Sequence, residues 1–455
     1  MANRFLWAVP KLLVIADDLS GATDVGAQFA KCGIAAFVSL AGRRKPLVGH
    51  ARCAQPPVQS ESPVWSNLKE ILTAHEVVLL DTESRHLPSG EARSRVAAAV
   101  RQGLAAGVRH FYKKTDSTLR GNVGAELEAL LEASGQPTVA FIPAHPRLGR
   151  TTRAGVQCVG DRPLHESAFA HDPRNPVAES RVATILAHQT QVPITTISTS
   201  SLASFERPPP AGISIFDAET VEDIRAAARA IQRAGCLGAV AGPAAFAECL
   251  IDLLPFHRGP ARTARFAGPM LVVNGSVHET ALRQCAHARL AGFLEARMSP
   301  DDLLPEPDAG IGGNKDLIDK ARGLLDRGRS FLLTSLRRRE ELGEFEDVAH
   351  RMGVERTQVH ERVAANTARI VRQIMGASRS RVPPVLVVFG GDTLAAIARE
   401  LNWSGLIARG EALPGVAVCE VPDPPGTIVL AKPGGFGPDN LLELLTESST
   451  RFSGG

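Results

Sequence analysis

The dominant pattern in this 455-residue sequence is a short apolar, β-branched run followed by a polar turn and then by a helical pattern. The pattern occurs at KLLVIA (11–16), EVVLLD (76–81), TVAFIPA (138–144) and GISIFDA (212–218), and it resumes after residue 270. Strands that alternate with helices predict βα units and a mainly parallel sheet. The sequence therefore predicts an α/β fold in which helices flank the sheets.

The length is about three times the usual domain size of roughly 150 residues, so more than one domain is expected. The strand–helix pattern weakens over FHRGPARTARFAGP (256–269), which is rich in Arg, Pro and Gly. We therefore predict two domains, residues 1–258 and residues 266–455, each with a mainly parallel sheet flanked by helices. Segments 40–63 and 300–313 are predicted to be loops because Pro and polar residues accumulate there.

Composition excludes several classes of protein. The chain is 44% hydrophobic and 22% charged with a net charge of +3, which is too small to indicate nucleic acid or an anionic membrane as a partner. No apolar run reaches the roughly 18 residues of a membrane span, and Lys11 interrupts the first apolar run, so we predict a cytoplasmic protein. The seven cysteines form no CxxC motif and are predicted to be reduced thiols.

Polar clusters follow several of the predicted strands, and ligands of parallel sheets bind beyond the carboxyl ends of strands. The first cluster is Asp17-Asp18-Leu19-Ser20-Gly21, where two carboxylates precede a predicted helix. One Asp is explained as a helix N-cap, which is worth about 1 kcal/mol. A second Asp, together with a glycine that allows close approach of a ligand, indicates a functional site.

The second cluster is KTDSTLRGN (114–122), between a predicted strand and a predicted helix. Lys114 and Arg120 supply positive charge, whereas Asp116 and Ser117 supply hydrogen-bonding oxygens. Asn122 is predicted to cap the helix. A capping loop needs only one or two of these residues, whereas a site for a small polyhydroxylated anion uses all of them. Arginine binds a carboxylate with two parallel hydrogen bonds, which lysine does less well.

Two further clusters are ambiguous. Arg150 lies in GRTTRAG (149–155) after the strand TVAFIPA, and this segment is either a solvated basic loop or an anion site. Arg85 lies in DTESR (81–85) after another predicted strand, with the same two alternatives.

The second predicted domain has glycine turns at three strand ends. They are Asn274-Gly275-Ser276, Gly390-Gly391-Asp392-Thr393 and Lys432-Pro433-Gly434-Gly435. Such turns let backbone approach phosphates, whose charge is favoured at helix N-termini. A single glycine turn is weak evidence, but three in one domain indicate a nucleotide site. The sequence contains neither GxxxxGK[ST] nor GxGxxG, so it is neither a standard P-loop nor a standard dinucleotide site.

Taken together, these motifs resemble the four-carbon acid sugar kinase family. The resemblance is carried in order from about residue 12 to residue 446 by these segments: IADDLSGATDVGAQFAKCG, KKTDSTLRGN, GRTTRAGVQCVGDRPLHESAFAHDPRNPV, VVNGSVHETALRQ, FGGDTLAAIARELN, LPGVAVCEV and KPGGFGPDNLL. Ser20 replaces the threonine of the family's DDxTGA pattern. A second departure is Pro243, in a segment where family members often have GSxGL, because proline lacks an N–H donor.

The resemblance implies an N-terminal domain that binds a small-molecule sugar acid and a C-terminal domain that binds ATP. It implies transfer of the γ-phosphate to the terminal hydroxyl of D-threonate, D-erythronate or 3-oxo-tetronate, and the DPxNPV segment favours D-threonate. By resemblance, ATP contacts fall on Ser276, on the turn Gly390-Gly391-Asp392-Thr393 and on Gly434-Gly435.

The hypothesis for the mechanism combines the motifs with this resemblance. Arg120 and Lys114 would hold the acid's carboxylate, Asp116 and Ser117 its hydroxyls, and Asp17 or Asp18 would act as the general base. Mg²⁺ and Lys432 would stabilise phosphate charge, although no metal ligands are identified.

Two other functions remain as alternatives. The chain could be a non-catalytic sensor of an acid sugar or nucleotide, or a nicotinamide-dependent dehydrogenase, which would normally carry the missing glycine fingerprint. A homo-oligomer is compatible with the sequence, which does not determine the oligomeric state.

Overall fold

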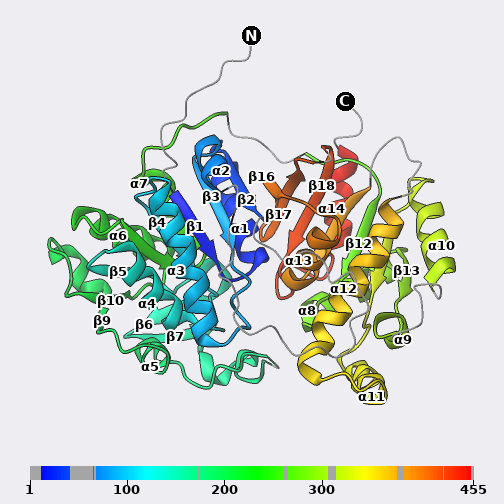
Figure 1. The fold of residues 1–455 in the computed structure, drawn as a ribbon, viewed down its shortest axis with the longest axis horizontal. Coiled ribbons are helices and arrows are strands. Elements are labelled where there is room, and N and C mark those ends of the chain that lie inside the picture. The colour runs from blue at the N-terminus through cyan, green and yellow to red at the C-terminus, as the bar shows by residue number, and fades with distance from the viewer. Residues whose placement is uncertain are drawn as a thin grey trace, which may run out of the picture. The chain divides into compact units, whose positions relative to one another are not determined.

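A computed structural model describes residues 12–40, 65, 68–172, 174–260, 265–305, 314–376, 384–423 and 425–451. The chain folds as two compact units, and each unit is a sheet flanked by helices (Figure 1). Unit 1 contains the described residues up to 260, and unit 2 contains those from 265 onward. Among the described residues, no helix has the length and apolar character that a membrane span requires.

Unit 1 contains a parallel sheet with the strand order β2-β3-β1-β4-β11-β5-β10-β9. Its strands are β1 (Leu12–Ala16), β2 (Ala36–Ser39), β3 (Val77–Asp81), β4 (Phe111–Lys114), β5 (Thr138–Phe141), β9 (Ile194–Ile197), β10 (Gly212–Phe216) and β11 (Ala239–Gly242). Its helices are α1 (Leu19–Lys31), α2 (Leu68–Ala74), α3 (Ser89–Ala105), α4 (Val123–Ser134), α5 (Val182–Ala187), α6 (Val221–Arg233) and α7 (Ala244–Leu253).

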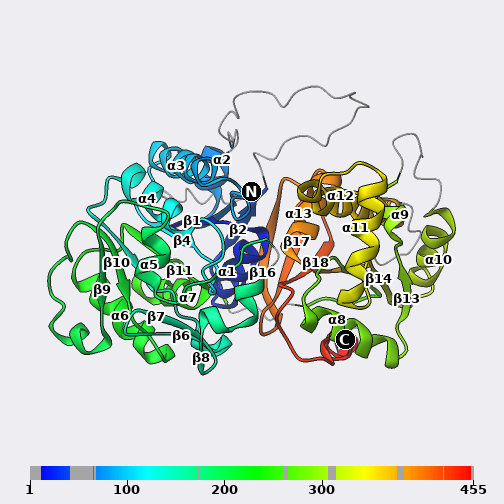
Figure 2. The same ribbon diagram turned by 90° about the horizontal axis from the view of Figure 1, so that it is seen from below.

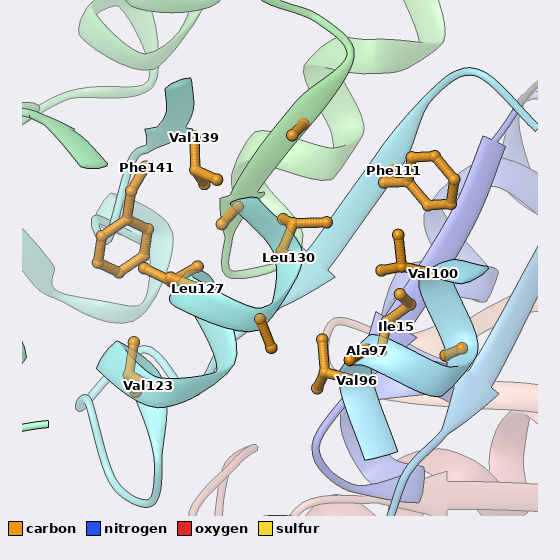
Figure 3. Close-up of a cluster of buried hydrophobic side chains, with 14 of the residues drawn as sticks. Ile15, Val96, Ala97, Val100, Phe111, Val123, Leu127, Leu130, Val139 and Phe141 are labelled. Atoms are coloured by element: carbon orange, nitrogen blue, oxygen red, sulfur yellow. The ribbon is translucent and has the colours of Figure 1, made fainter. Parts of the chain in front are cut away.

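Helices cover both faces of this sheet, with α2, α3 and α4 on one face and α1, α6 and α7 on the other (Figure 2). Strands that are covered on both faces are continuous apolar runs, and all five residues of β1 are buried. On the α3 and α4 face, Val100, Leu127 and Leu130 pack toward the strands in one buried cluster (Figure 3). This packing fixes the positions of the strand ends, where the polar motifs begin.

A small antiparallel sheet in unit 1 was not predicted. It consists of β6 (Arg150–Arg153), β7 (Val156–Val159) and β8 (Arg162–Pro163). Residues 150–153 of the segment GRTTRAG, which the sequence left as either a solvated basic loop or an anion site, therefore form a strand. The turn between β6 and β7 places Ala154 and Gly155 at φ values of 47° and 74°. The flanking strands, RTTR and VQCV, lack the regular alternation of apolar and polar residues that would reveal a hairpin in the sequence.

Unit 2 contains a sheet with the strand order β13-β14-β12-β15-β18-β17-β16. Neighbours from β13 to β18 are parallel, whereas β17 is antiparallel to both β18 and β16. Its strands are β12 (Met270–Asn274), β13 (Leu294–Arg297), β14 (Phe331–Thr334), β15 (Val385–Phe389), β16 (Gly405–Leu413), β17 (Val416–Val421) and β18 (Thr427–Lys432). The prediction of mainly parallel sheets flanked by helices is confirmed.

The helices of unit 2 are α8 (Glu279–Leu290), α9 (Pro300–Leu303), α10 (Lys315–Leu325), α11 (Leu342–Arg351), α12 (Arg356–Met375), α13 (Gly391–Glu400) and α14 (Leu441–Arg451). The predicted loop at 300–313 was wrong in its first part, because Ser299 caps the short helix α9. Residues 306–313 and nearly all of the predicted loop at 40–63 lie outside the described residues.

In each sheet, two neighbouring parallel strands near the middle are followed by connections that run in opposite directions along the sheet. In unit 1 the chain passes from β1 to β2 and β3 on one side and then returns to β4 on the other side. In unit 2 it passes from β12 to β13 and β14 and then returns to β15. Ligands of open α/β sheets bind beyond the carboxyl ends of the strands at such a switch point. Ligands are therefore expected beyond the carboxyl ends of β1 and β4, and beyond those of β12 and β15.

Candidate active site

Arg85 joins the two adjacent carboxylates that follow β1. Its Nε donates to Asp17 Oδ2 at 2.6 Å, and its Nη1 donates to Asp18 Oδ2 at 2.7 Å. The backbone N–H groups of Ser84 and Arg85 also donate to the carbonyl of Asp17, at 3.1 and 3.3 Å. The DTESR turn after β3 is therefore attached to the turn after β1. Of the two alternatives that the sequence left for Arg85, the structure excludes a solvated basic side chain.

The two carboxylates have different surroundings. Asp18 is the N-cap of α1, because its Oδ1 accepts a hydrogen bond from the N–H of Gly21 at 2.8 Å. Both oxygens of Asp18 are thus engaged. Asp17 is 3% exposed, and its Oδ1 has no hydrogen-bond partner among the described residues. A buried carboxylate oxygen without a partner costs free energy, so this atom is available for a ligand.

Positive charges keep Asp17 ionised. Burial raises the pKa of this carboxyl, but the charges of Arg85 and Lys113 outweigh burial, and the pKa lies below its ordinary value. Asp17 is therefore a charged hydrogen-bond acceptor at neutral pH.

Lys114 reaches under the start of α1. An added Cβ at Gly21 would lie 2.9 Å from Lys114 Nζ and 2.7 Å from Asp18 Oδ1. Any residue larger than glycine at this position would collide with the ammonium group of Lys114. Lys114 Nζ donates to the carbonyl of Thr115 at 3.0 Å, which leaves further donor capacity, since an ammonium has three N–H groups.

Lys113 and Glu126 form a buried ion pair that sequence reasoning missed. Lys113 Nζ lies 3.0 Å from Glu126 Oε2, and the side chains are 0% and 2% exposed. The hydroxyl of Ser84 bonds the other oxygen of Glu126. Burial raises the pKa of Glu126 above its ordinary value, although Lys113 opposes the rise. In the sequence, Lys113 ends the run VRHFYK and Glu126 is one of three glutamates in VGAELEALLEA, so no local signal links the two residues.

Arg120 is held between two carboxylates. Its Nε and Nη2 each donate to Asp116, both at 2.9 Å, and its Nη1 donates to Asp172 at 3.1 Å. Burial raises the pKa of Asp116, but Arg120 and Arg85 lower it well below its ordinary range. The aromatic ring of Phe169 lies under this guanidinium, 5.3 Å from Arg120 Cζ to the ring centroid.

Arg150 and His145 add a second group of polar atoms near the same ring. Arg150 Cζ lies 5.6 Å from the centroid of Phe169, and backbone hydrogen bonds pair Arg150 with His145. Burial, together with the charges of Lys114 and Arg150, lowers the pKa of His145 to about 3, so its imidazole is neutral at pH 7. No motif in the sequence sets His145 apart.

The predicted cap of α4 was wrong. Asn122 occupies the N-cap position, but its side chain makes no capping bond to α4. Its Nδ2 instead donates to the carbonyls of Ser84 and Leu87, at 3.0 and 2.8 Å. The amide thus joins the turn after β4 to the turn after β3. Sequence spacing predicts a local partner for such a residue, whereas these partners lie more than 30 residues away in the chain.

Ser117 and Pro243 follow the carboxyl ends of two neighbouring strands, β4 and β11. The carbonyl of Ser117 accepts a hydrogen bond from Gln157 of β7 at 2.9 Å, which attaches the small antiparallel sheet to the KTDSTLRGN turn. Pro243 follows β11, and its carbonyl accepts a hydrogen bond from the hydroxyl of Tyr112 at 2.6 Å. This proline, a departure from the family pattern, therefore fixes the turn after β11 through its carbonyl.

Unpaired buried atoms concentrate at these strand ends. In unit 1, the buried side-chain atoms without a hydrogen-bond partner among the described residues are Asp17 Oδ1, Thr115 Oγ1, His145 Nδ1 and Arg150 Nε. Asp17, Thr115 and His145 lie shortly after β1, β4 and β5, and Arg150 begins β6, where backbone hydrogen bonds pair it with His145. Since buried polar groups are normally satisfied, three such atoms at the carboxyl ends of parallel strands and a fourth on the adjoining strand β6 indicate a binding site for a polar ligand.

In unit 2, the three glycine turns follow strands that are neighbours in the sheet. The strands β12, β15 and β18 are adjacent, so their carboxyl ends meet at one edge. An added Cβ at Gly275 would lie 1.8 Å from Thr393 Oγ1, and one at Gly434 would lie 2.2 Å from Ser276 Oγ. The turns therefore pack so closely that side chains at these glycines would collide with their neighbours. Gly390 has a φ of 108° at the start of α13, a conformation that favours glycine.

Lys432 is a buried cation at the end of β18. It is 1% exposed, its Nζ donates to the carbonyl of Gly434 at 3.0 Å, and it lies 4.3 Å from the ring centroid of Phe389. Burial lowers the pKa of Lys432 to about 7. A buried ammonium of this kind gains stability from an incoming anion.

The comparisons with known proteins agree with this arrangement. Family models match residues 12–250, described as a sugar-binding N-terminal domain, and residues 271–442, described as a nucleotide-binding C-terminal domain. A D-threonate kinase of Salmonella typhimurium (strain LT2) is 30% identical over 453 residues, covering 95% of this chain and 96% of the relative. A D-erythronate kinase of Heliobacterium modesticaldum is 28% identical, covering 89% of this chain and 88% of the relative. The chain therefore belongs to the four-carbon acid sugar kinase family, which confirms the resemblance.

A solved structure supports the fold alone. A Salmonella typhimurium LT2 protein described as a tRNA synthase matches with a TM-score of 0.72 and 19% identity. The match covers 97% of this chain and 99% of that chain. At this identity the likeness establishes a common architecture and no common activity.

The buried pair beneath the site gives a stability prediction. Replacing Lys113 with Met leaves Glu126 buried without its partner, which should lower the free energy of unfolding by about 3–5 kcal/mol. The double variant Lys113→Met/Glu126→Leu removes both charges and should recover most of that loss. Urea unfolding followed by circular dichroism measures both effects. Equal losses in the single and double variants would contradict the ion-pair account.

Proposed function

We propose that this protein is an ATP-dependent kinase that phosphorylates the 4-hydroxyl of a four-carbon sugar acid, with D-threonate as the substrate. D-erythronate and 3-oxo-tetronate are the alternative acids. The observation that carries the proposal is the buried, ionised Asp17, which has an unpaired oxygen at the switch point of unit 1. The names of the two kinase relatives support the reaction class and the choice of acid.

Asp17 is the proposed general base. The sequence left Asp17 and Asp18 as alternatives, but both oxygens of Asp18 accept hydrogen bonds, from Gly21 and Arg85. Asp17 keeps one oxygen for the substrate hydroxyl, while Arg85 fixes the other. A positioned base contributes roughly 10²–10⁴-fold to the rate. In a phosphoryl transfer most of the remaining acceleration comes from positioning and charge stabilisation.

Basic side chains around Asp17 would bind the acid's carboxylate. Arg150 has an unpaired Nε, and Lys114 has spare donors, so we assign the carboxylate first to these two residues. Arg120 remains a proposed contact, but Asp116 and Asp172 already occupy its guanidinium. Its first role is therefore to orient Asp116, whose carboxylate would accept a hydrogen bond from a hydroxyl of the substrate. Ser117 and Arg85 complete the proposed acid site.

The glycine turns of unit 2 would bind ATP. The N-terminus of α13 would offer the backbone N–H groups of Gly391 and Thr393 to phosphates. The N–H of Gly390 already donates to the carbonyl of Lys432, so Gly390 would contribute close approach of the backbone rather than a donor. The turns that contain Ser276 and Gly434-Gly435 complete the proposed ATP site. Lys432 would neutralise phosphate charge from its buried position. Kinase sites commonly hold Mg²⁺ through phosphates and one or two carboxylates. Asp392, in the first turn of α13, fits that requirement because it is exposed beside the glycine turns.

The two other functions are less well supported. A non-catalytic sensor would need no general base, yet Asp17 retains a buried, unpaired oxygen at a cost in stability. A dehydrogenase would need a dinucleotide fingerprint, and the turn after β12 is Asn-Gly-Ser rather than GxGxxG.

ADP release with Mg-ATP and a panel of four-carbon acids tests the proposed reaction. We expect strong turnover with D-threonate and weak turnover with L-threonate, D-erythronate, L-erythronate and 3-oxo-tetronate. Strong turnover with a different acid would change the proposed substrate but would support the proposed reaction. ATP binding by calorimetry without turnover of any acid would favour the sensor.

The assignment of the base is tested by a matched pair of variants. Asp17→Asn should lower kcat by about 10²–10⁴-fold, because the amide cannot accept the proton. Asp18→Asn should lower kcat less than about tenfold, because Asn is as good an N-cap as Asp. Steady-state kinetics with saturating Mg-ATP measures both. The reverse order of effects would identify Asp18 as the base.

Lys432 predicts how ATP affinity depends on pH. With a pKa of about 7, its ammonium is charged below neutrality and loses its charge as the pH rises. ATP should therefore bind more weakly above pH 7, by at most about tenfold per pH unit. Lys432→Met should bind ATP weakly at every pH. Calorimetric titrations of both proteins from pH 6 to 9 separate this effect from the titration of ATP itself, and parallel curves would contradict the role of Lys432.

A further inference from the structure

The hydroxyl group of Thr115 is buried without a hydrogen-bond partner among the described residues. The side chain is 1% exposed. Other buried threonines of unit 1 are satisfied: Thr82 bonds the carbonyl of Ala16 at 2.7 Å, and Thr138 bonds that of Gly212 at 3.1 Å. The sequence predicts no role for Thr115, although this residue lies within KTDSTLRGN.

The position of Thr115 in the sheet brings it next to Asp17. Strands β1 and β4 are parallel neighbours, with Ala16 paired to Lys114, so Asp17 and Thr115 are the next residues on each strand. The N–H of Thr115 still bonds the carbonyl of Gly242 at 3.0 Å, so the ladder extends through this residue. The side chain of Thr115 therefore follows the same alternation between the two faces of the sheet as the residues of β4.

The two side chains share a face of the sheet. Residues two apart on a strand lie on the same face. Ile15 and Phe111 belong to the cluster on the α3 and α4 face, so Asp17 and Thr115 project toward that face as well. Lys113, between Phe111 and Thr115 in this alternation, contacts Glu126 of α4 and confirms the direction. Asp17 Oδ1 and Thr115 Oγ1 are therefore unpaired buried atoms on adjacent strands and on one face.

A buried hydroxyl without a partner lowers stability, and an apolar side chain of the same shape would remove that cost. Valine has this shape and is common in buried strands. A threonine at this position is therefore explained by a ligand that bonds the hydroxyl. Neighbouring strands lie roughly 4.8 Å apart, a span that two adjacent oxygen-bearing carbons of a small acid can bridge.

We propose that Thr115 is a specificity-determining residue whose hydroxyl bonds the oxygen on the carbon next to the reacting hydroxyl of the acid. The assignment rests on the proposed function, in which Asp17 Oδ1 takes the reacting hydroxyl. The hydroxyl of threonine both donates and accepts, so it serves a hydroxyl or an oxo group at that carbon. It selects against an acid that lacks this oxygen.

The test combines a variant with a substrate analogue. The wild type, Thr115→Val and Thr115→Ser are assayed with the four-carbon acid that the wild type turns over best and with 2,4-dihydroxybutanoate, which lacks the oxygen next to the reacting hydroxyl. The wild type should prefer the complete acid in kcat/KM by roughly 10–100-fold, the effect of one good hydrogen bond. Thr115→Val should reduce this preference to about one, whereas Thr115→Ser should retain it. The KM for ATP should not change.

Thermal unfolding of the same variants separates a binding role from a structural role. Thr115→Val should be as stable as the wild type or more stable, because no hydrogen bond of the free protein is lost. The matched control is Thr138→Val, which removes the bond to Gly212 at the opposite end of β5 and should lower Tm without changing the preference.

Three results would overturn the assignment. An unchanged preference in Thr115→Val, with an active wild type, would overturn this inference alone. A Tm loss in Thr115→Val as large as that in Thr138→Val would show that the hydroxyl is structural. A wild type that turns over no four-carbon acid would overturn the proposed function and this role of Thr115 together.

Discussion

Arg85 holds the adjacent carboxylates of Asp17 and Asp18 with two short hydrogen bonds, and the rest of the proposed acid site depends on this contact. Without it, two negative charges would lie side by side at the end of a buried strand. With it, Asp18 caps α1 while Asp17 stays ionised and keeps one oxygen for a ligand. The guanidinium itself comes from the turn after β3, so the sheet order that places β3 beside β1 creates the site.

Both units apply the same principle with different chemistry. In unit 1 the strand ends at the switch point carry charged side chains, which suits a small hydroxylated anion. In unit 2 the ends of β12, β15 and β18 carry glycines, which suits phosphates that are bound by backbone N–H groups. Lys432 is the exception in unit 2, a buried cation whose Nζ bonds the carbonyl of Gly434 and whose charge a bound anion would stabilise.

The sequence was sufficient for the fold class and for the strand ends that carry polar residues, because buried parallel strands are apolar runs that end abruptly. It could not distinguish Asp17 from Asp18, since the difference lies in one hydrogen bond from Gly21. It also missed the pairing of Lys113 with Glu126 and the unpaired hydroxyl of Thr115. Such features depend on partners from distant elements, and local patterns of charge or hydrophobicity contain no information about them.

The most direct test of this account is a crystal structure of the protein with its acid substrate bound. The account predicts that the terminal hydroxyl lies within hydrogen-bond distance of Asp17 Oδ1, while Arg85 still bonds Asp17 Oδ2 and Asp18 remains the cap of α1. A terminal hydroxyl that contacts Asp18 instead, or an acid bound away from the carboxyl ends of β1 and β4, would contradict it.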